Sequence, residues 1–197
     1  GHIESSPSNR AFQSVWSTGL LHDVGKPLTR SFDERGTAHY YGHAEKSREI
    51  AQNVLNELKA DNTTKEEVLF LVGHHDSPAE KNVEEVKRRL SHYGEEKYRA
   101  LIDLRRADNS AQSEDFKRTE QHDRCLEMLS EILESQSCFA LKNLKINGDD
   151  LLALGFPKGS LIGQTLSALL DGVITEKYPN NREELHKIAK NLLDSRK

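Results

Sequence analysis

The sequence has little of the features that mark secreted, membrane-spanning and disulfide-rich proteins. Its 197 residues include two cysteines, Cys125 and Cys138, which cannot build a disulfide framework. The longest apolar run, Val68 to Val72, is far too short to cross a bilayer. No positively charged segment followed by an apolar segment opens the chain, as in a secretory leader. These absences predict a reducing, cytoplasmic location and argue against a membrane span.

Positive charge is not in excess either. Lys and Arg number 28 against 32 for Asp and Glu, which gives a formal net charge of −4. A protein that binds nucleic acid mainly through a broad basic surface is therefore not expected. Residues 141–197 differ, because they hold nine Lys or Arg and seven Asp or Glu. If the chain contacts RNA, this tail is where the contact is expected.

The spacing of apolar residues favours helix almost throughout. They recur at intervals of three and four without the alternation typical of strands, and this predicts an all-α helical bundle. Gly25 and Pro27 end the first helix, with Gly25 in a left-handed cap. A short hairpin-like insertion is expected across residues 29–41, with its turn at Asp33 to Gly36. The predicted helices cover residues 11–24, 43–59, 65–75, 84–91, 95–112, 115–134, 161–176 and 183–193.

The polar run Ser135-Gln136-Ser137 is the best candidate for a domain boundary. It predicts one domain over residues 1–134 and a small helical C-terminal extension over residues 138–197. Turns are expected at Asn147-Gly148 and around residues 155–159. Asn181 is expected to cap the last helix, with Glu184 at the third position of the capping box.

Histidine and aspartate recur on or beside the apolar stripes of the predicted helices. Burying such ionisable groups is costly unless they pair or bind a cation. A mixture of imidazole and carboxylate favours a divalent ion such as Mn, Fe, Co, Ni or Zn, with Mg as a further candidate. The sequence therefore predicts a metal site. Its candidate residues are His22, Asp23, His43, His75 and Asp108.

Other histidines fit a site less well. His75 is in helical phase with its apolar neighbours, whereas His74 is rotated away from them. His122 precedes an aspartate, as His22 does, but it shares its face with leucines on a helix that offers no other ligand types. We interpret His122 as an ordinary packing histidine.

These residues resemble a known family, the HD-domain metal-dependent phosphohydrolases. In that family a histidine, a His-Asp pair, further histidines and a distant aspartate follow one another. The similarity is closest to the HD-containing C-terminal half of bacterial tRNA nucleotidyltransferases, which belong to the CCA-adding enzyme and poly(A) polymerase family. The strings that carry the resemblance are residues 20–27, 41–43, 71–76, 104–108, 138–142, 146–151 and 179–185.

The resemblance implies an HD-domain bundle over residues 1–134 with a ligand set for one divalent metal. Its ligands would be His22, Asp23 and Asp108. His2 would complete the set if it is native to the protein, because it lies twenty residues before His22, at the family's spacing.

Further roles follow from the same resemblance. His43 and His75 are the catalytic candidates, which would bind a second ion or protonate the leaving oxygen. Lys26 and Arg30 are candidates to contact the substrate phosphate. These roles are expectations that depend on the chain folding as the family does.

The resemblance implies hydrolysis of a phosphoester or nucleotide by a phosphatase, 2′,3′-cyclic phosphodiesterase or nucleotidase. An alternative is a non-catalytic tRNA-binding region of a CCA-adding-type protein, and a third is an HD scaffold that only binds partners. A Gly-Ser motif followed by an Asp-x-Asp pair, which marks a nucleotidyltransferase head, does not occur in these 197 residues. The chain itself is therefore not expected to add nucleotides.

Overall fold

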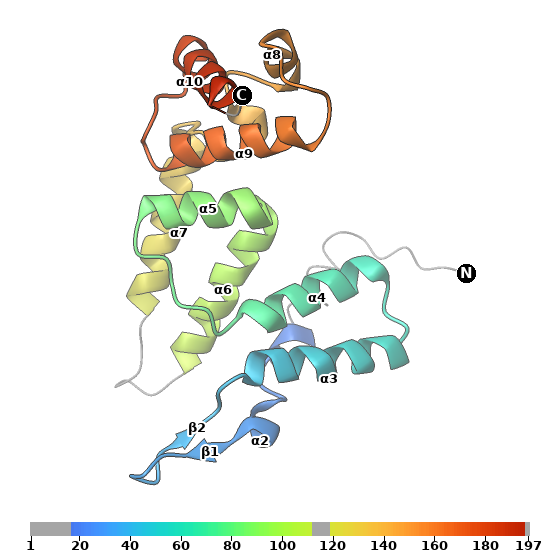
Figure 1. Ribbon diagram of the computed structural model, residues 1–197. Helices are drawn as coiled ribbons and strands as arrows, with labels where there is room; N and C mark the ends of the chain where they lie inside the picture. The colour runs from blue at the N-terminus through green and yellow to red at the C-terminus, as the bar shows by residue number, and fades with distance from the viewer. Residues whose placement is uncertain (1–16, 112–118, 196–197) are drawn as a thin grey trace, which may run out of the picture. The chain divides into compact units, whose positions relative to one another are not determined.

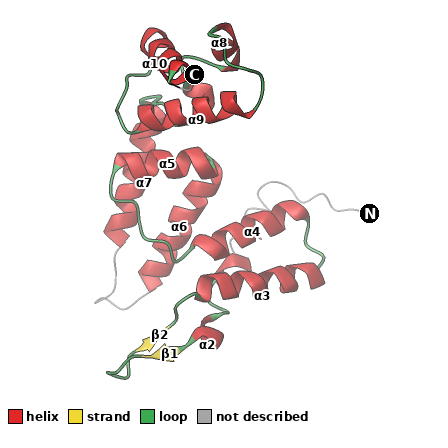
Figure 2. Cartoon of the chain, viewed as in Figure 1, coloured by secondary structure: helices red, strands yellow, loops and turns green. Residues whose placement is uncertain are grey.

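The computed structural model describes residues 17–111 and 119–195 of the chain. Helices and loops make up nearly all of the described part, and one small sheet has two short strands (Figures 1 and 2). The predicted all-α helical bundle is confirmed. His2 lies outside the described residues, as do residues 11–16 of the first predicted helix and residues 115–118 of the sixth.

The described chain packs as two compact units. Unit 1 contains the described residues up to Ala79 and, after an excursion of the chain, those of the Glu95–Asp123 segment. Unit 2 contains Glu80–Gly94 and the described residues from Arg124 onward. The predicted division into residues 1–134 and 138–197 stays a prediction.

Unit 1 is built on two helices that run side by side, α3 (His43–Glu57) and α4 (Asn62–His74) (Figure 1). Their apolar stripes face each other, which follows from the three-and-four spacing of the sequence. The buried residues at this contact include Ala51, Leu55, Val68 and Val72. Helix α6 (Glu95–Ala111) contacts α4 and buries Tyr98, Leu101 and Ile102.

The predicted hairpin is present in unit 1. A short helix, α2 (Lys26–Thr29), packs against α3 and leads into β1 (Ser31–Phe32), which pairs antiparallel with β2 (Ala38–His39). The Asp33 carboxylate holds the turn, because its Oδ1 accepts hydrogen bonds from the backbone N–H groups of Arg35 and Thr37. This bonding is the Asx type that aspartate favours in turns.

The left-handed conformation predicted for Gly25 is wrong. Gly25 has φ −81° and ψ −14°, which any residue can adopt. The glycine is needed for space, because a Cβ there would lie 2.6 Å from the Ser47 backbone nitrogen and 2.7 Å from the His43 carbonyl oxygen. The Gly25 N–H also donates to Ser47 Oγ at 2.9 Å. A close approach to α3 therefore fixes the turn that follows the helical residues 17–21.

Unit 2 is organised around α9 (Ser160–Ile174), which contacts its neighbours on several sides. The neighbours are α5 (Val83–Tyr93), the 3₁₀ helix η2 (Leu141–Asn143), α8 (Gly148–Ala153) and α10 (Arg182–Asp194). Helix α7 (Thr119–Glu134) supplies further buried residues from Arg124 onward. Fully buried Leu151, Leu169 and Leu185 join α8, α9 and α10 in one core.

Three helices of unit 2, α5, α8 and α10, begin at an asparagine cap, namely Asn82, Asn147 and Asn181. Asn181 accepts a hydrogen bond from the Glu184 backbone N–H at 2.8 Å, as predicted for α10. Helix α8 was not predicted, because six residues are too few for a periodic pattern. Its capping box lies within the predicted Asn147 turn, where Asn147 and Asp150 satisfy each other's backbone N–H groups.

No helix in the described ranges combines the length and the apolar character that a membrane span requires.

The cap of α4 allows a stability prediction. Asp61 accepts from the Thr64 hydroxyl at 2.7 Å and from its backbone N–H at 3.0 Å, and these bonds hold the pKa of Asp61 below its ordinary value. We expect Asp61→Ala to lower the free energy of unfolding by about 1 kcal/mol at neutral pH, as measured by urea denaturation.

The pH dependence provides the control for this cap. A carboxylate with a lowered folded-state pKa contributes stability that is present above the unfolded pKa of about 3.9 and is lost as the pH falls through the folded pKa. Asp61→Asn keeps a capping oxygen, so it should retain most of the neutral-pH stability without that acid-dependent loss. An Asp61→Ala variant as stable as the parent protein would contradict the assignment.

Candidate metal centre

The first group of candidate ligands forms around His22, in the turn after residues 17–21. His22 Nδ1 lies 3.0 Å from the Gly19 carbonyl oxygen and 3.3 Å from that of Thr18. A carbonyl oxygen only accepts, so Nδ1 carries the proton and a neutral imidazole presents a lone pair on Nε2. That Nε2 lies 3.4 Å from Asp23 Oδ2 and 3.5 Å from Asp108 Oδ1.

The second group forms around two buried histidines at the ends of α3 and α4. His43 Nδ1 contacts the Tyr40 carbonyl oxygen at 2.9 Å, and His75 Nδ1 contacts that of Val72 at 2.7 Å. Both imidazoles therefore direct Nε2 inward, and the two Nε2 atoms are 3.1 Å apart. They lie 3.5 Å and 3.6 Å from Asp23 Oδ1.

Asp23 joins the two groups, because each of its carboxylate oxygens belongs to one of them. Oδ2 lies beside His22, and Oδ1 lies beside His43 and His75. Within each group, the ligand atoms all lie within 4.8 Å of one another. The chain thus brings together the five described residues predicted as metal ligands or catalytic histidines, from the turn at residues 22–25, from α3 and α6, and from the residue that follows α4.

The donor chemistry of both groups fits a divalent cation. Two ligands that each lie about 2.1 Å from a tetrahedral ion are about 3.4 Å apart, close to the separations seen here. Nitrogen lone pairs and carboxylate oxygens that face one another repel unless a proton or a cation lies between them. Each histidine also donates its other ring nitrogen to a backbone carbonyl, the usual support for a metal-ligating imidazole.

Burial and the close contacts among these residues shift the pKa values of three of them. The hydrogen bond to Asp108, opposed by partial burial, raises the pKa of His22 above its ordinary value. The same bond lowers the pKa of the Asp108 carboxyl. Burial lowers the pKa of His75, so that imidazole favours its neutral form, which is the form that ligates metals.

One of the two predicted phosphate contacts, Lys26, lies beside the site. Lys26 Nζ is 2.6 Å from Asp23 Oδ2 and 5.9 Å from the centre of the Tyr40 ring. The Arg30 guanidinium lies 4.7 Å from the centre of the Phe32 ring, on the hairpin. Lys26 therefore borders the candidate ligands, and the contact of either residue with phosphate stays a prediction.

His74 and His122 are among the histidines that belong to neither group. His74 directs Nδ1 to the Phe70 carbonyl oxygen at 2.7 Å and packs against the Phe70 ring. His122 is buried in α7 and belongs to neither group. The structure thus separates His75 from its neighbour His74, in line with their helical phases.

Sequence reasoning missed two buried polar residues that hold the site in place. Ser47 accepts from the Gly25 N–H and thereby ties the turn carrying Asp23 to α3. Arg105 is 3% exposed and donates to the His74 carbonyl oxygen at 3.3 Å, next to His75. Both residues share a helical face with a candidate ligand, Ser47 four residues after His43 and Arg105 three before Asp108. Their helical spacing from a predicted ligand could have identified both residues from the sequence.

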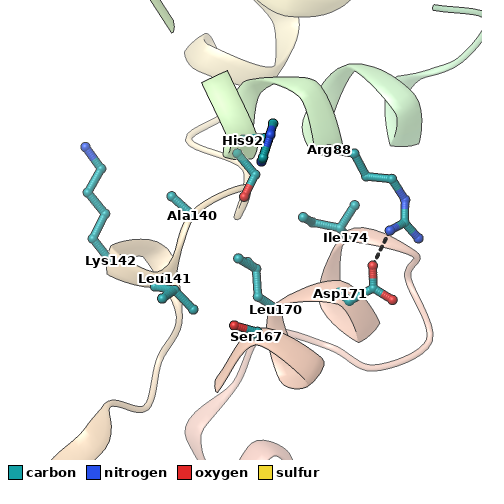
Figure 3. A pocket seen from close by; sticks show the side chains of 10 residues that line it. Arg88, His92, Ala140, Leu141, Lys142, Ser167, Leu170, Asp171 and Ile174 are labelled. Atoms are coloured by element: carbon teal, nitrogen blue, oxygen red, sulfur yellow. Dashed lines mark hydrogen bonds and ion pairs between the residues drawn. The ribbon is translucent and has the colours of Figure 1, made fainter. Parts of the chain in front are cut away.

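A separate pocket of about 620 Å³ lies in unit 2 between α5, η2 and α9 (Figure 3). Arg88 and Lys142 line it from α5 and η2, and Leu170 and Ile174 of α9 supply an apolar part. The guanidinium of Arg88 is ion-paired with Asp171, as Figure 3 shows. The pocket therefore combines cationic and apolar groups.

Comparison with known proteins identifies the family. The sequence model of the family described as tRNA nucleotidyltransferase domain 2 matches residues 39–189. The chain is also similar to a CC-adding tRNA nucleotidyltransferase of Thermus thermophilus, with 34% identity over 157 residues. That match covers 77% of this chain and 34% of the relative, so the chain spans about a third of the relative's length. No solved structure was found to match the chain. Because the family match covers most of the sequence, the chain belongs to the tRNA nucleotidyltransferase domain 2 family.

Proposed function

We propose that the chain is a divalent-metal-dependent phosphohydrolase of the HD type. One observation carries this proposal. Three imidazole Nε2 atoms converge on the carboxylates of Asp23 and Asp108, while each Nδ1 is committed to a backbone carbonyl. The arrangement gathers several potential ligands for a cation. Each imidazole already has the tautomer that leaves Nε2 able to bind it.

The proposed metal ligands are His22, Asp23 and Asp108, with His43 and His75 as a second set that shares Asp23. A divalent ion held there supplies Lewis acidity, which stabilises charge on a phosphoryl oxygen and makes water nucleophilic near neutral pH. The protein fixes the three imidazoles before substrate binds. They are held by their hydrogen bonds to the Gly19, Tyr40 and Val72 carbonyl oxygens.

Lys26 is proposed to bind the substrate phosphate. Its ammonium contacts Asp23 Oδ2 at the edge of the candidate centre, where an anionic oxygen can take over that contact. Arg30, whose guanidinium lies over the Phe32 ring, is proposed as a second phosphate contact. The family is named for tRNA nucleotidyltransferases, and so a phosphoester of a nucleotide or of an RNA end is proposed as the substrate.

A second candidate function is non-catalytic binding of tRNA in the cytoplasm. The similar protein of Thermus thermophilus is named for its action on tRNA, and the pocket in unit 2 offers Arg88 and Lys142 beside an apolar surface. The tail from residue 141 has more basic than acidic residues. If tRNA binds there through phosphate contacts, its affinity should fall steeply with salt, because neutralised phosphates release counterions.

Asp108→Asn tests the enzymatic proposal. The substitution removes one anionic ligand, so we expect divalent-metal affinity and phosphoester hydrolysis to fall by more than the roughly 10- to 100-fold cost of losing a supporting partner. Metal content is measured by elemental analysis after dialysis against Mn²⁺, and hydrolysis is measured with AMP and 2′,3′-cyclic AMP. Asp103→Asn, at an exposed position of the same helix, is the matched control.

The two candidate functions give different outcomes. Metal content and turnover unchanged in Asp108→Asn would overturn the phosphohydrolase. A parent protein that hydrolyses neither nucleotide with any divalent ion, but binds tRNA with strong salt dependence, would replace it with the second candidate.

A further inference from the structure

A lysine contacts one of the candidate metal ligands at hydrogen-bond distance. The Lys26 ammonium lies 2.6 Å from Asp23 Oδ2, and His22 Nε2 lies 3.4 Å from the same oxygen. That oxygen belongs to the first group of candidate ligands, which also includes Asp108. Lys26 and a divalent ion would therefore share one binding atom.

Lys26 differs from the other charged or polar neighbours of Asp23. Among the described residues, the remaining groups within ion-pair distance of this carboxylate are the imidazoles of His22, His43 and His75. An imidazole can bind a metal ion through a nitrogen lone pair, whereas an ammonium group has only N–H donors and carries a compact positive charge. Lys26 thus places a cation, and not a further ligand, on the atom that a divalent ion would bind.

The charge of Lys26 also acts on the second carboxylate of this group. The hydrogen bond with His22, opposed by partial burial, is the main cause that lowers the pKa of the Asp108 carboxyl, and the positive charges of His22, Lys26 and His75 lower it further. Like charges a few ångströms apart repel each other. A cation that acts on both carboxylates therefore opposes the binding of a second cation by the same group.

The contact between Lys26 and Asp23 is of a kind that breaks easily. The two side chains are 40% and 36% exposed, and ion pairs at such exposure are weak. The ammonium also lies 5.9 Å from the centre of the Tyr40 ring, a distance at which an aromatic face attracts a cation. Lys26 can therefore leave Asp23 and still remain beside the candidate centre.

We infer that Lys26 couples metal binding to phosphate binding. Its ammonium competes with a divalent ion for Asp23 Oδ2, and binding of the ion transfers the ammonium from Asp23 to the substrate phosphate. The inference rests on the proposed function and adds a binding order to it. Phosphate would bind well only to the metal-loaded protein, because only there is the lysine released from its carboxylate.

Thermodynamic linkage makes this coupling reciprocal. If a bound ion raises the affinity for phosphate by some factor, phosphate raises the affinity for the ion by the same factor. Part of that factor would come from direct attraction between the ion and the phosphate. The part that depends on Lys26 is the part that a variant without the ammonium group loses.

The test titrates the full chain with Mn²⁺, with and without inorganic phosphate, and measures free Mn²⁺ by electron paramagnetic resonance. Without phosphate, Lys26→Met should bind Mn²⁺ at least about 5-fold more tightly than the parent protein, the low end of ordinary coupling between sites. The factor by which phosphate tightens Mn²⁺ binding should fall by at least about 5-fold in the same variant. Lys46→Met is the matched control, because Lys46 is 42% exposed and also pairs with a carboxylate three residues later, that of Glu49.

The direction of the change in Mn²⁺ affinity decides the inference. An unchanged affinity in Lys26→Met would leave Lys26 at most a phosphate contact, and a weaker affinity would make it a support for Asp23; either result overturns the coupling. If the coupling is found but AMP and 2′,3′-cyclic AMP are not hydrolysed, the proposed function fails and the coupling stands. If the parent protein hydrolyses them and Lys26→Met binds Mn²⁺ as the parent does, only the coupling fails. A parent protein that binds no Mn²⁺ overturns both.

Discussion

Asp23→Asn should abolish both candidate cation groups at once. Asp23 contributes one oxygen to each group. Its substitution therefore takes an anionic ligand from the group with His22 and Asp108 and from the group with His43 and His75. An amide offers one neutral acceptor oxygen in place of two anionic ones. We expect bound Mn²⁺ to fall below detection and phosphoester hydrolysis to fall by more than about 100-fold, a larger loss than for a supporting residue.

Folding of the metal-free protein provides the control for this variant. Asp23 also pairs with Lys26, but both side chains are more than one third exposed, and such pairs contribute about 0–1 kcal/mol. The free energy of unfolding without metal, measured by urea denaturation, should therefore change by less than about 1 kcal/mol. If Asp23→Asn kept as much metal as the parent protein, the shared role of Asp23 would be wrong.

Gly25→Ala should damage both the fold of unit 1 and the site. The new methyl group would meet the backbone of α3 at Ser47 and His43, and a helix backbone cannot move aside as a flexible side chain can. Overpacking of this kind costs about 1–3 kcal/mol, occasionally more. Relief of the clash requires the turn to move away from α3. That movement would separate Asp23 from His43.

Gly19→Ala is the matched control, because a Cβ at Gly19 meets nothing within 4 Å. Within the helical residues 17–21, the alanine should be neutral or stabilising by about 0.5–1 kcal/mol. We expect the thermal unfolding temperature and the Mn²⁺ content to fall in Gly25→Ala. Neither quantity should fall in Gly19→Ala. A Gly25→Ala protein with the stability and metal content of the parent would show that the turn tolerates the added methyl group.

Much of the fold was predictable because its helices are long and periodic. Helices α3, α4 and α9 begin and end within a few residues of the predicted ranges, since their apolar stripes and caps are local features of the sequence. Helix α8 was not predicted, because its six residues are too few to show apolar residues recurring at helical spacing. Gly25 was singled out for a local reason, a left-handed cap, whereas its contact with Ser47, 22 residues later, is tertiary.

The candidate site was predictable as a set of residues but not as an arrangement. Helical phase selected His75 over His74, and position on an apolar face selected Asp108. That Asp23 serves two groups depends on the direction of its carboxylate, which is set only when three helices meet the turn. The roles of these residues stay predictions, and His2 lies outside the described chain.

The path of the chain between the two units limits how the protein can be divided. The chain enters unit 2 at Glu80, leaves it after Gly94 and returns at Arg124. A fragment that ends at residue 134 therefore retains α5 but lacks α9, one of the helices on which α5 packs. One proteolytic cleavage cannot release either half intact. Module exchange with a relative would have to transfer both interleaved stretches together.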